Sequence, residues 1–307
     1  MHIRAGGYAA EIRPAAGGLL HRLTAAQGGG AVDLLHAPAG VAPSTASPNL
    51  FGLWPLVPFA NRAFGGRVEA DGIAFRVALN DPGGGAAIHG FGWQADWAVV
   101  AAGTDHVVLE HRRDASPDTD HPDPDHPDPY RYVARERFAL SEAGLRVDLT
   151  VVNTATQPLP FGLGLHPWFP CDPDTRLTMR AGGALRLGPG YRAIGHGPVP
   201  AELDFAAGAH VHRGQEVVAS YTGWDGTARL DYPARGFAIR IAADADLAAP
   251  LLWAPPDAEF VCLEPQTHAI GAPSEAAARA VTPLRILAPG ASWTVSMTIA
   301  LEPIPRA

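Results

Sequence analysis

The chain has 307 residues, of which 47% are hydrophobic and 18% charged, a composition that excludes extensive disorder and is typical of a compact globular protein. No apolar run reaches the roughly 18 residues that a membrane-spanning helix needs, and the N-terminus lacks an apolar core followed by a cleavage site. Cys171 and Cys262 are too few for a disulfide scaffold, and free thiols suit a reducing compartment. We therefore expect a cytoplasmic protein without a membrane partner.

The formal net charge of −8 is concentrated in residues 114–130, a segment with six aspartates and no basic residue. The rest of the chain is nearly neutral and has no basic stripe for a nucleic-acid backbone, so no nucleic-acid partner is expected. All 23 basic residues are arginine. This excludes mechanisms that need a lysine amine, such as Schiff-base catalysis and Walker-type nucleotide binding.

Alternating apolar and polar residues predict strands at 145–151, 237–241 and 295–301. The Asp-Gly pairs at 71–72 and 225–226 lie between extended segments and predict tight hairpin turns.

The helical signal is weak, and its best candidate is a short alanine-rich helix capped by Ser274. The 34 glycines and 30 prolines predict many turns and loops between strands. This pattern favours an all-β protein built as a large antiparallel sandwich. No repeat or linker divides the chain, so we expect a single domain over residues 1–307.

The Asp/Pro/His-rich segment 114–130 is the one low-complexity stretch. Proline blocks ladder hydrogen bonds and the aspartates repel one another, which predicts an exposed loop. His121 and His126 raise the alternative of a divalent-metal site. The prolines scatter these ligands, and we expect no metal there.

Residues 53–62, LWPLVPFANR, end an apolar run with Asn61 and Arg62. A guanidinium group suits paired hydroxyl oxygens or a carboxylate, so Arg62 is a candidate for ligand binding or for a salt bridge.

In residues 86–93, AAIHGFGW, His89 precedes Gly90 and Gly92, with Phe91 and Trp93 interleaved. The glycines would clear the backbone beside the imidazole. A purely structural histidine is the alternative.

Residues 161–170, FGLGLHPWFP, would place Gly162, Gly164 and His166 on one face of an extended segment, with Trp168 just beyond. Such a face would let a flat ligand, for example a sugar, approach the backbone closely. The alternative is an irregular loop with a structural histidine.

In residues 260–268, FVCLEPQTH, Phe260, Cys262 and Glu264 share one face of a predicted strand. Partial desolvation by these neighbours would raise the pKa of Glu264 and make it a stronger base once ionised. A rim glutamate paired with an arginine is the alternative.

The four motifs occur in the order Asn-Arg, His-Gly, His-Pro-Trp-Phe and Leu-Glu-Pro-Gln. In this order, the sequence resembles the aldose 1-epimerase (galactose mutarotase) family, and more closely its bacterial branch with VPFANR and HPWF forms. The resemblance runs from about Asn49 to Glu302. It implies a galactose mutarotase-like β-supersandwich with an open sugar cleft and no metal or organic cofactor.

The resemblance also implies roles for individual residues. His166 matches the general acid on the ring oxygen, and Glu264 matches the general base on the C1 hydroxyl. His89 and Arg62 match sugar-binding residues, with Asn61 beside them. Trp54, Trp93 and Trp168 are candidates for stacking on the sugar.

One departure concerns a substrate-binding aspartate that family members commonly carry in the region aligned with residues 218–221. No acidic residue occurs there, and Asp225 in the predicted turn is a possible substitute. This departure affects the expected sugar preference more than the reaction type.

The expected function is therefore that of a cofactor-independent isomerase that interconverts the α and β anomers of a free aldose. One alternative is a non-catalytic carbohydrate-binding module on the same fold, and another is an epimerase of a sugar phosphate. A glycosidase would need two carboxylates flanking the scissile bond, and only one carboxylate lies in a ligand-like motif.

Overall fold

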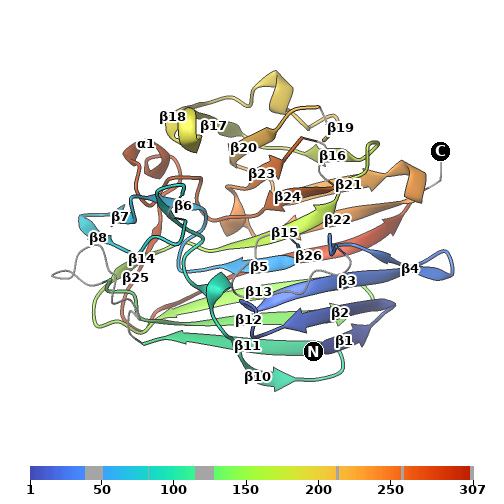
Figure 1. Ribbon diagram of the computed structural model, residues 1–307, viewed down its shortest axis with the longest axis horizontal. Helices are drawn as coiled ribbons and strands as arrows, with labels where there is room; N and C mark the ends of the chain where they lie inside the picture. Colours follow the sequence, from blue (N-terminus) through green and yellow to red (C-terminus); the bar gives the residue numbers. More distant parts are fainter. Residues whose placement is uncertain (39–50, 82, 115–127, 212–213, 257–258, 305–307) are drawn as a thin grey trace.

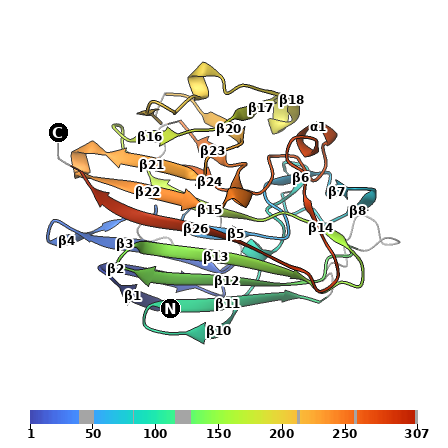
Figure 2. The same cartoon turned by 180° about the vertical axis from the view of Figure 1, so that it is seen from behind.

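The computed structural model describes residues 1–38, 51–81, 83–114, 128–211, 214–256 and 259–304, and most of them lie in antiparallel strands (Figure 1). Two large sheets form the body of the molecule, seen from opposite sides in Figure 1 and Figure 2. The expected all-β fold is thus confirmed. No helix in these ranges is long and apolar enough to cross a membrane.

The first sheet has 11 strands among the described residues and carries the candidate site. Its order is β1 (His2–Ala5), β2 (Tyr8–Arg13), β3 (Leu19–Gln27), β5 (Leu53–Leu56), β15 (Gly164–Pro170), β24 (Phe260–Glu264), β23 (Leu251–Ala254), β20 (Val217–Thr222), β17 (Gly183–Leu187) and β18 (Ala193–Gly197), with β4 (Gly30–Asp33) paired to β3.

The second sheet has nine strands within the same ranges. They follow the order β10 (Ala98–Ala102), β11 (His106–Arg113), β12 (Tyr132–Ser141), β13 (Gly144–Asn153), β26 (Ser292–Pro303), β22 (Phe237–Ala243), β21 (Thr227–Tyr232), β16 (Arg176–Met179) and β19 (Ala209–His210). The three strands predicted from alternation are β13, β22 and β26, which are neighbours at the centre of this sheet.

Short elements gather at one end of the two sheets (Figure 1). They are the pairs β6 (Arg62–Phe64) with β9 (Ala86–Ile88), β7 (Arg67–Ala70) with β8 (Ile73–Arg76), and β14 (Leu159–Phe161) with β25 (Arg285–Leu287), together with the helix α1 (Ala276–Arg279). Five single 3₁₀ turns complete the described elements: η1 (Gly92–Gln94), η2 (Pro189–Tyr191), η3 (Ala201–Leu203), η4 (Pro233–Arg235) and η5 (Ala245–Leu247).

The local turn predictions have different outcomes. Asp71 and Gly72, both at positive φ, form the two-residue turn between β7 and β8, as predicted. The prediction of a hairpin at Asp225-Gly226 is wrong, because the strands on either side, β20 and β21, belong to different sheets. That turn instead carries the chain from one sheet to the other.

The predicted alanine-rich helix exists as α1, but Ser274 does not cap it. The residue before the helix is Glu275, which makes no side-chain cap. The Ser274 hydroxyl instead accepts a hydrogen bond from the Phe64 backbone N–H, at 3.0 Å. It therefore fastens the helix region to β6, a strand of the candidate site.

The apolar core lies between the two sheets and receives alternate side chains from their central strands. On β15 and the residues before it, Leu163, Leu165 and Phe169 enter this core. The residues between them point to the opposite face, where His166 and Trp168 lie. This alternation places a buried imidazole on the outer face of a rigid central strand.

Most of the acidic segment, residues 115–127 with His121 and His126, lies outside the described residues. Its C-terminal end is not exposed as predicted, because Asp128 is buried and bonds to Arg113 at 2.6 Å. A carboxylate in this environment is held by its ion pair and by the Tyr130 backbone N–H.

Candidate active site

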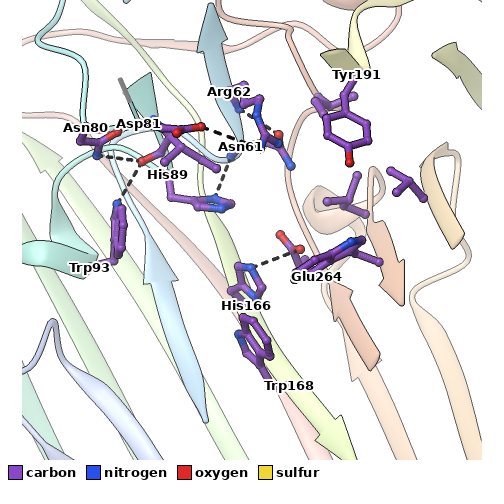
Figure 3. Close-up of a pocket in the computed structure, with 15 residues that line it drawn as sticks. Asn61, Arg62, Asn80, Asp81, His89, Trp93, His166, Trp168, Tyr191 and Glu264 are labelled. Atoms are coloured by element: carbon purple, nitrogen blue, oxygen red, sulfur yellow. Dashed lines mark hydrogen bonds and ion pairs between the residues drawn. The ribbon is translucent and has the colours of Figure 1, made fainter. Parts of the chain in front are cut away.

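The side chains of His166 and Glu264 meet because β15 and β24 are adjacent antiparallel strands. Trp168 lies opposite Cys262 in this ladder, and an isolated bridge pairs Gly164 with Gln266. His166 and Glu264 occupy the position between these two pairs, on the same face. The His166 Nε2 atom lies 3.3 Å from Glu264 Oε1 (Figure 3).

Burial shifts the pKa values of Glu264 and His166 in opposite directions. Desolvation raises the pKa of Glu264 to about 8, against smaller lowering effects of a hydrogen bond from Gln266 and of the Arg62 charge. Desolvation lowers the pKa of His166 to about 3. Between these values the pair holds one proton, and both shifts favour its location on Glu264, 3.3 Å from His166 Nε2. The expected desolvation of Glu264 is therefore present in the structure.

Gln266 orients the Glu264 carboxyl group through the oxygen that does not face His166. Its Nε2 group donates to Glu264 Oε2 at 2.8 Å. Gly164, directly opposite Gln266, makes room for this side chain, since a Cβ at residue 164 would lie 3.1 Å from Gln266 Cγ. The space beside Gly162 is occupied in the same way, because a Cβ there would lie 2.2 Å from His268 Cδ2.

These contacts correct the expected purpose of the glycines. We predicted that Gly162 and Gly164 would expose backbone to a ligand, whereas the space beside them is filled by the side chains of His268 and Gln266. The space beside Gly90 and Gly92 is likewise occupied by protein, since a Cβ at either position would collide with Val57. The glycines pack the wall of the site and do not themselves form the binding surface.

His89 stands next to His166, with their ring centroids 5.2 Å apart. His89 has a φ of 60° and Asn61 a φ of 52°, and the two residues are joined by hydrogen bonds in both directions. The His89 backbone N–H donates to the Asn61 carbonyl at 2.8 Å, and the Asn61 backbone N–H donates to His89 Nδ1 at 3.1 Å. Burial holds the pKa of His89 well below its ordinary value. A neutral imidazole that accepts at Nδ1 carries its hydrogen on Nε2, so His89 is set up as a hydrogen-bond donor.

Asn61 therefore contacts His89 through its backbone and the Arg62 backbone through its side chain. Its side-chain oxygen accepts a hydrogen bond from the Arg62 backbone N–H at 2.9 Å. The Arg62 guanidinium lies 3.9 Å from Asp81 Oδ2 and its central carbon is 5.2 Å from the centroid of the Tyr191 ring (Figure 3). Arg62 therefore has both an ion-pair partner and an aromatic neighbour at the site.

The three tryptophans proposed for stacking occupy different places. Trp168 lies parallel to the His166 ring, with 5.4 Å between centroids and 10° between planes. Trp93 lines the site and donates its indole N–H to the Ile88 carbonyl at 3.0 Å. Trp54 lies opposite His166 on the neighbouring strand β5, where it is buried and donates its indole N–H to the Phe51 carbonyl, and it does not line the cavity. A fourth tryptophan, Trp253, does line it.

These groups surround a cavity of about 380 Å³. Its lining includes all six predicted site residues and several that the sequence analysis did not single out: Asn80, Asp81, Ile88, Tyr191, Val218, Leu251, Trp253 and Ile270. These eight come from loops and strand ends with no recognisable local motif. Their relation to the predicted residues becomes visible only in the folded structure, where Asp81 and Tyr191 lie beside Arg62.

The region aligned with the missing aspartate contributes Val218 to the cavity and no polar group. Ser220 and Tyr221 bond to backbone groups of Ile270 and Leu203. The carboxylate of Asp225 accepts hydrogen bonds from Thr227 within its own turn. Asp225 does not line the cavity and is not the substitute that we considered.

A metal ion is an alternative ligand for this cluster, since donor atoms of His89, His166 and Glu264 all lie within 4.8 Å of one another. The chemistry of His89 does not fit this role. Its Nδ1 lone pair is taken by the Asn61 N–H, and its Nε2 atom then carries the hydrogen. The donor set is better suited to hydrogen bonding than to coordination.

Comparison with known proteins agrees with this geometry. Residues 3–300 match the family model described as aldose 1-epimerase. The chain belongs to the aldose 1-epimerase family. Its relatives include the uncharacterized Escherichia coli K12 protein YphB, which is 32% identical over 259 residues that cover 81% of this chain and 83% of YphB.

Solved structures of similar proteins share the aldose 1-epimerase fold. A candidate aldose 1-epimerase from E. coli K12 has 27% identity and a TM-score of 0.83, with 99% of this chain and 98% of that chain covered. A galactose mutarotase-like protein from Clostridium acetobutylicum has 20% identity and a TM-score of 0.84, with 99% and 95% covered, and supports the fold alone. Family membership supports an epimerase role at the level of the family.

Proposed function

We propose that this protein is an aldose 1-epimerase that interconverts the α and β anomers of a free aldose, with His166 and Glu264 as its acid and base. The observation that carries the proposal is the 3.3 Å contact between His166 Nε2 and Glu264 Oε1 on the wall of a cavity of about 380 Å³. A cavity of this size lies within the range of about 300–1,000 Å³ that is typical of small-molecule sites.

Ring opening needs one proton removed and one delivered. Ionised Glu264 takes the proton from O1 while protonated His166 delivers one to the ring oxygen, so that the C1–O5 bond breaks and O1 becomes the aldehyde oxygen. The pair enters this step after its single proton shifts from Glu264 to His166. No proton has to come from solvent.

In the open-chain state, Glu264 holds the proton and His166 is neutral. Burial favours this same protonation state, since it raises the pKa of Glu264 and lowers that of His166. After rotation about C1–C2, His166 takes the proton back from O5 and Glu264 returns its proton to O1. The ring closes on the opposite face, and both side chains regain their starting states.

The neighbouring groups support these transfers. The positive charge of Arg62 lowers the pKa of Glu264 and so favours the ionised base. Nε2–H of His89 is a donor for a sugar oxygen next to His166. Such fixed donors hold the reacting atoms close to the acid and the base.

Polarimetry on freshly dissolved α-glucose and α-galactose tests the proposal. We expect the wild type to accelerate the approach to the equilibrium rotation, and the Glu264→Gln variant to lose this acceleration by a factor of about 10²–10⁴. Glu136→Gln is a matched control, because Glu136 is an equally buried carboxyl group on β12 and does not line the cavity. A Glu264→Gln variant as fast as the wild type would refute the assigned base.

A further inference from the structure

Asp81 places a second carboxylate in the cavity, at a wall formed by the connection between β8 and β9. One of its oxygens is anchored, since Oδ1 accepts a hydrogen bond from the Gly84 backbone N–H at 3.1 Å. Its backbone exchanges hydrogen bonds with Ala86 in both directions. The other oxygen, Oδ2, faces Arg62 (Figure 3).

Asn80 fixes this turn to the wall that carries His89. The Asn80 side chain accepts from the Ile88 N–H at 2.6 Å and donates to the carbonyls of Ile88 and Gly90, each at 3.0 Å. It also donates to Gln94 Oε1 at 2.9 Å. The Asn80 oxygen accepts one hydrogen bond, and its two amide hydrogens are shared among the three acceptors, so the Asp81 backbone is held in place before any ligand enters.

Asp81 and Arg62 lie near each other without a direct hydrogen bond between them. At 3.9 Å, the Nη2 to Oδ2 separation exceeds the 2.7–3.2 Å of a direct N–H···O hydrogen bond. A donor and an acceptor at this separation can each bond to a hydroxyl group placed between or beside them. Both side chains are partly exposed, 23% for Arg62 and 31% for Asp81, so a ligand can reach them.

The charges at the cavity favour an uncharged ligand. Arg62 is the one basic side chain that lines the cavity in the described part of the chain, and Asp81 balances it. His89 and His166 are neutral at neutral pH, because burial lowers the pKa of each. A further carboxylate, Glu216, accepts a hydrogen bond from the Trp253 indole at the edge of the cavity. A phosphate group would meet one arginine whose charge Asp81 balances and, in Glu216, a further nearby negative charge.

We propose that Asp81, together with Arg62, recognises hydroxyl groups of the sugar and selects uncharged aldoses over phosphorylated ones. In this way Asp81 supplies the carboxylate that is missing from residues 218–221, from a different wall of the cavity. This inference rests on the proposed function and specifies its substrate class. The carboxylate accepts hydroxyl hydrogens while the guanidinium donates to hydroxyl oxygens, and Asp81 repels a phosphate group.

The test compares the wild type, Asp81→Asn and Asp225→Asn on α-glucose, α-galactose and their 6-phosphates. Asp81→Asn keeps an oxygen for the Gly84 N–H, so the turn is retained while the charge is lost. Asp225→Asn is the control, since this carboxylate lies in a turn outside the cavity. Mutarotation gives KM and kcat, and calorimetry gives Kd for each sugar.

We expect Asp81→Asn to raise KM for the free sugars roughly tenfold, the effect of losing one hydrogen bond to a charged group, with kcat within about twofold of the wild type. The wild type should have a kcat/KM on the 6-phosphates at least roughly a hundredfold below that on the free sugars, because an uncompensated charge is costly to bury. Asp81→Asn should reduce the difference in kcat/KM between the free sugars and the 6-phosphates. Asp225→Asn should behave as the wild type.

An unchanged KM in Asp81→Asn overturns the inference and leaves the proposed function intact. A wild type that prefers the 6-phosphates overturns both the inference and the choice of a free aldose as substrate, and leaves only the acid–base roles of His166 and Glu264. Binding of free aldoses without turnover would refute the proposed function, while a tenfold higher Kd in Asp81→Asn would still support recognition by Asp81. Absence of both turnover and binding for every free aldose would overturn both proposals.

Discussion

His166 and Glu264 face each other across two neighbouring strands, 3.3 Å apart, between the cross-strand pairs Gly164/Gln266 and Trp168/Cys262. The ladder register, and not a loop conformation, therefore sets their separation. Both side chains are almost fully enclosed, and desolvation acts on each in favour of its neutral form. In the proposed mechanism, this pair exchanges a single proton.

The first prediction concerns pH. The pair can act only while it holds one proton, and the pKa of Glu264, raised to about 8, marks the loss of that proton. We expect kcat/KM to be level across neutral pH and to fall tenfold per pH unit well above about pH 8. Polarimetry from pH 6 to 10, corrected for the uncatalysed rate, measures this limb. An enzymatic rate that still increases at pH 10 contradicts it.

The second prediction concerns Gln266, a positioning residue. Its hydrogen bond to Glu264 lowers the pKa of that carboxyl group, so Gln266→Leu should move the alkaline limb to higher pH. It should also reduce kcat about tenfold, since the ionised base loses a hydrogen bond. Gln27→Leu is the control, because Gln27 bonds to Gly236 away from the cavity. An unshifted limb in Gln266→Leu would show that the hydrogen bond does not tune the base.

The third prediction concerns stability. Glu136 is fully buried on β12, neither of its carboxyl oxygens has a partner among the described residues, and burial raises its pKa well above 4.5. Glu136→Met should increase the free energy of unfolding by about 1–3 kcal/mol at neutral pH. Urea denaturation measures this gain.

The sign of the pH dependence follows from the raised pKa of Glu136. Above about pH 4.5 the unfolded chain ionises this group while the folded protein keeps it protonated, so the stability of the wild type falls with rising pH. The gain in Glu136→Met should therefore be larger at pH 8 than at pH 5. The exposed Glu142→Met, at the turn between β12 and β13, should change stability by less than about 0.5 kcal/mol. A destabilised Glu136→Met variant would mean that this carboxyl group has a partner after all.

The fourth prediction concerns metals. Because Nδ1 of His89 accepts the Asn61 N–H, we expect no metal to take part in the reaction. Mutarotation after dialysis against EDTA should equal that of protein dialysed in buffer alone. Activity that EDTA removes and Zn²⁺ restores would overturn the donor role of His89.

Much of the site could be predicted from the sequence because its main residues lie in ordered local motifs. Alternation within residues 260–268 predicted that Glu264 shares a face with Phe260 and Cys262, which belong to an apolar cluster, and Glu264 is buried as expected. The partnership of His166 with Glu264 depends on which strands pair. It came from the resemblance to a family, since alternation alone does not specify register.

Other features depended on packing that the sequence does not express locally. Asp81 lies in the sequence NDPGGG, which predicts a turn but no ligand site, and in the folded protein Asn80 bonds that turn to the His89 wall of the cavity. The space at Gly162 and Gly164 is filled by His268 and Gln266, residues about a hundred positions away. The turn at Asp225-Gly226 resembles a hairpin turn locally, but its two strands pair with distant segments in different sheets.

A double-variant cycle tests the central claim most directly, with mutarotation rates of wild type, His166→Asn, Glu264→Gln and the double variant measured on one free aldose. If the two side chains exchange a single proton as one unit, each single change should cost about 10²–10⁴ in kcat, and the double variant should lose little more than the worse single variant. Full activity in either single variant, or losses that multiply in the double variant, would contradict the shared-proton mechanism.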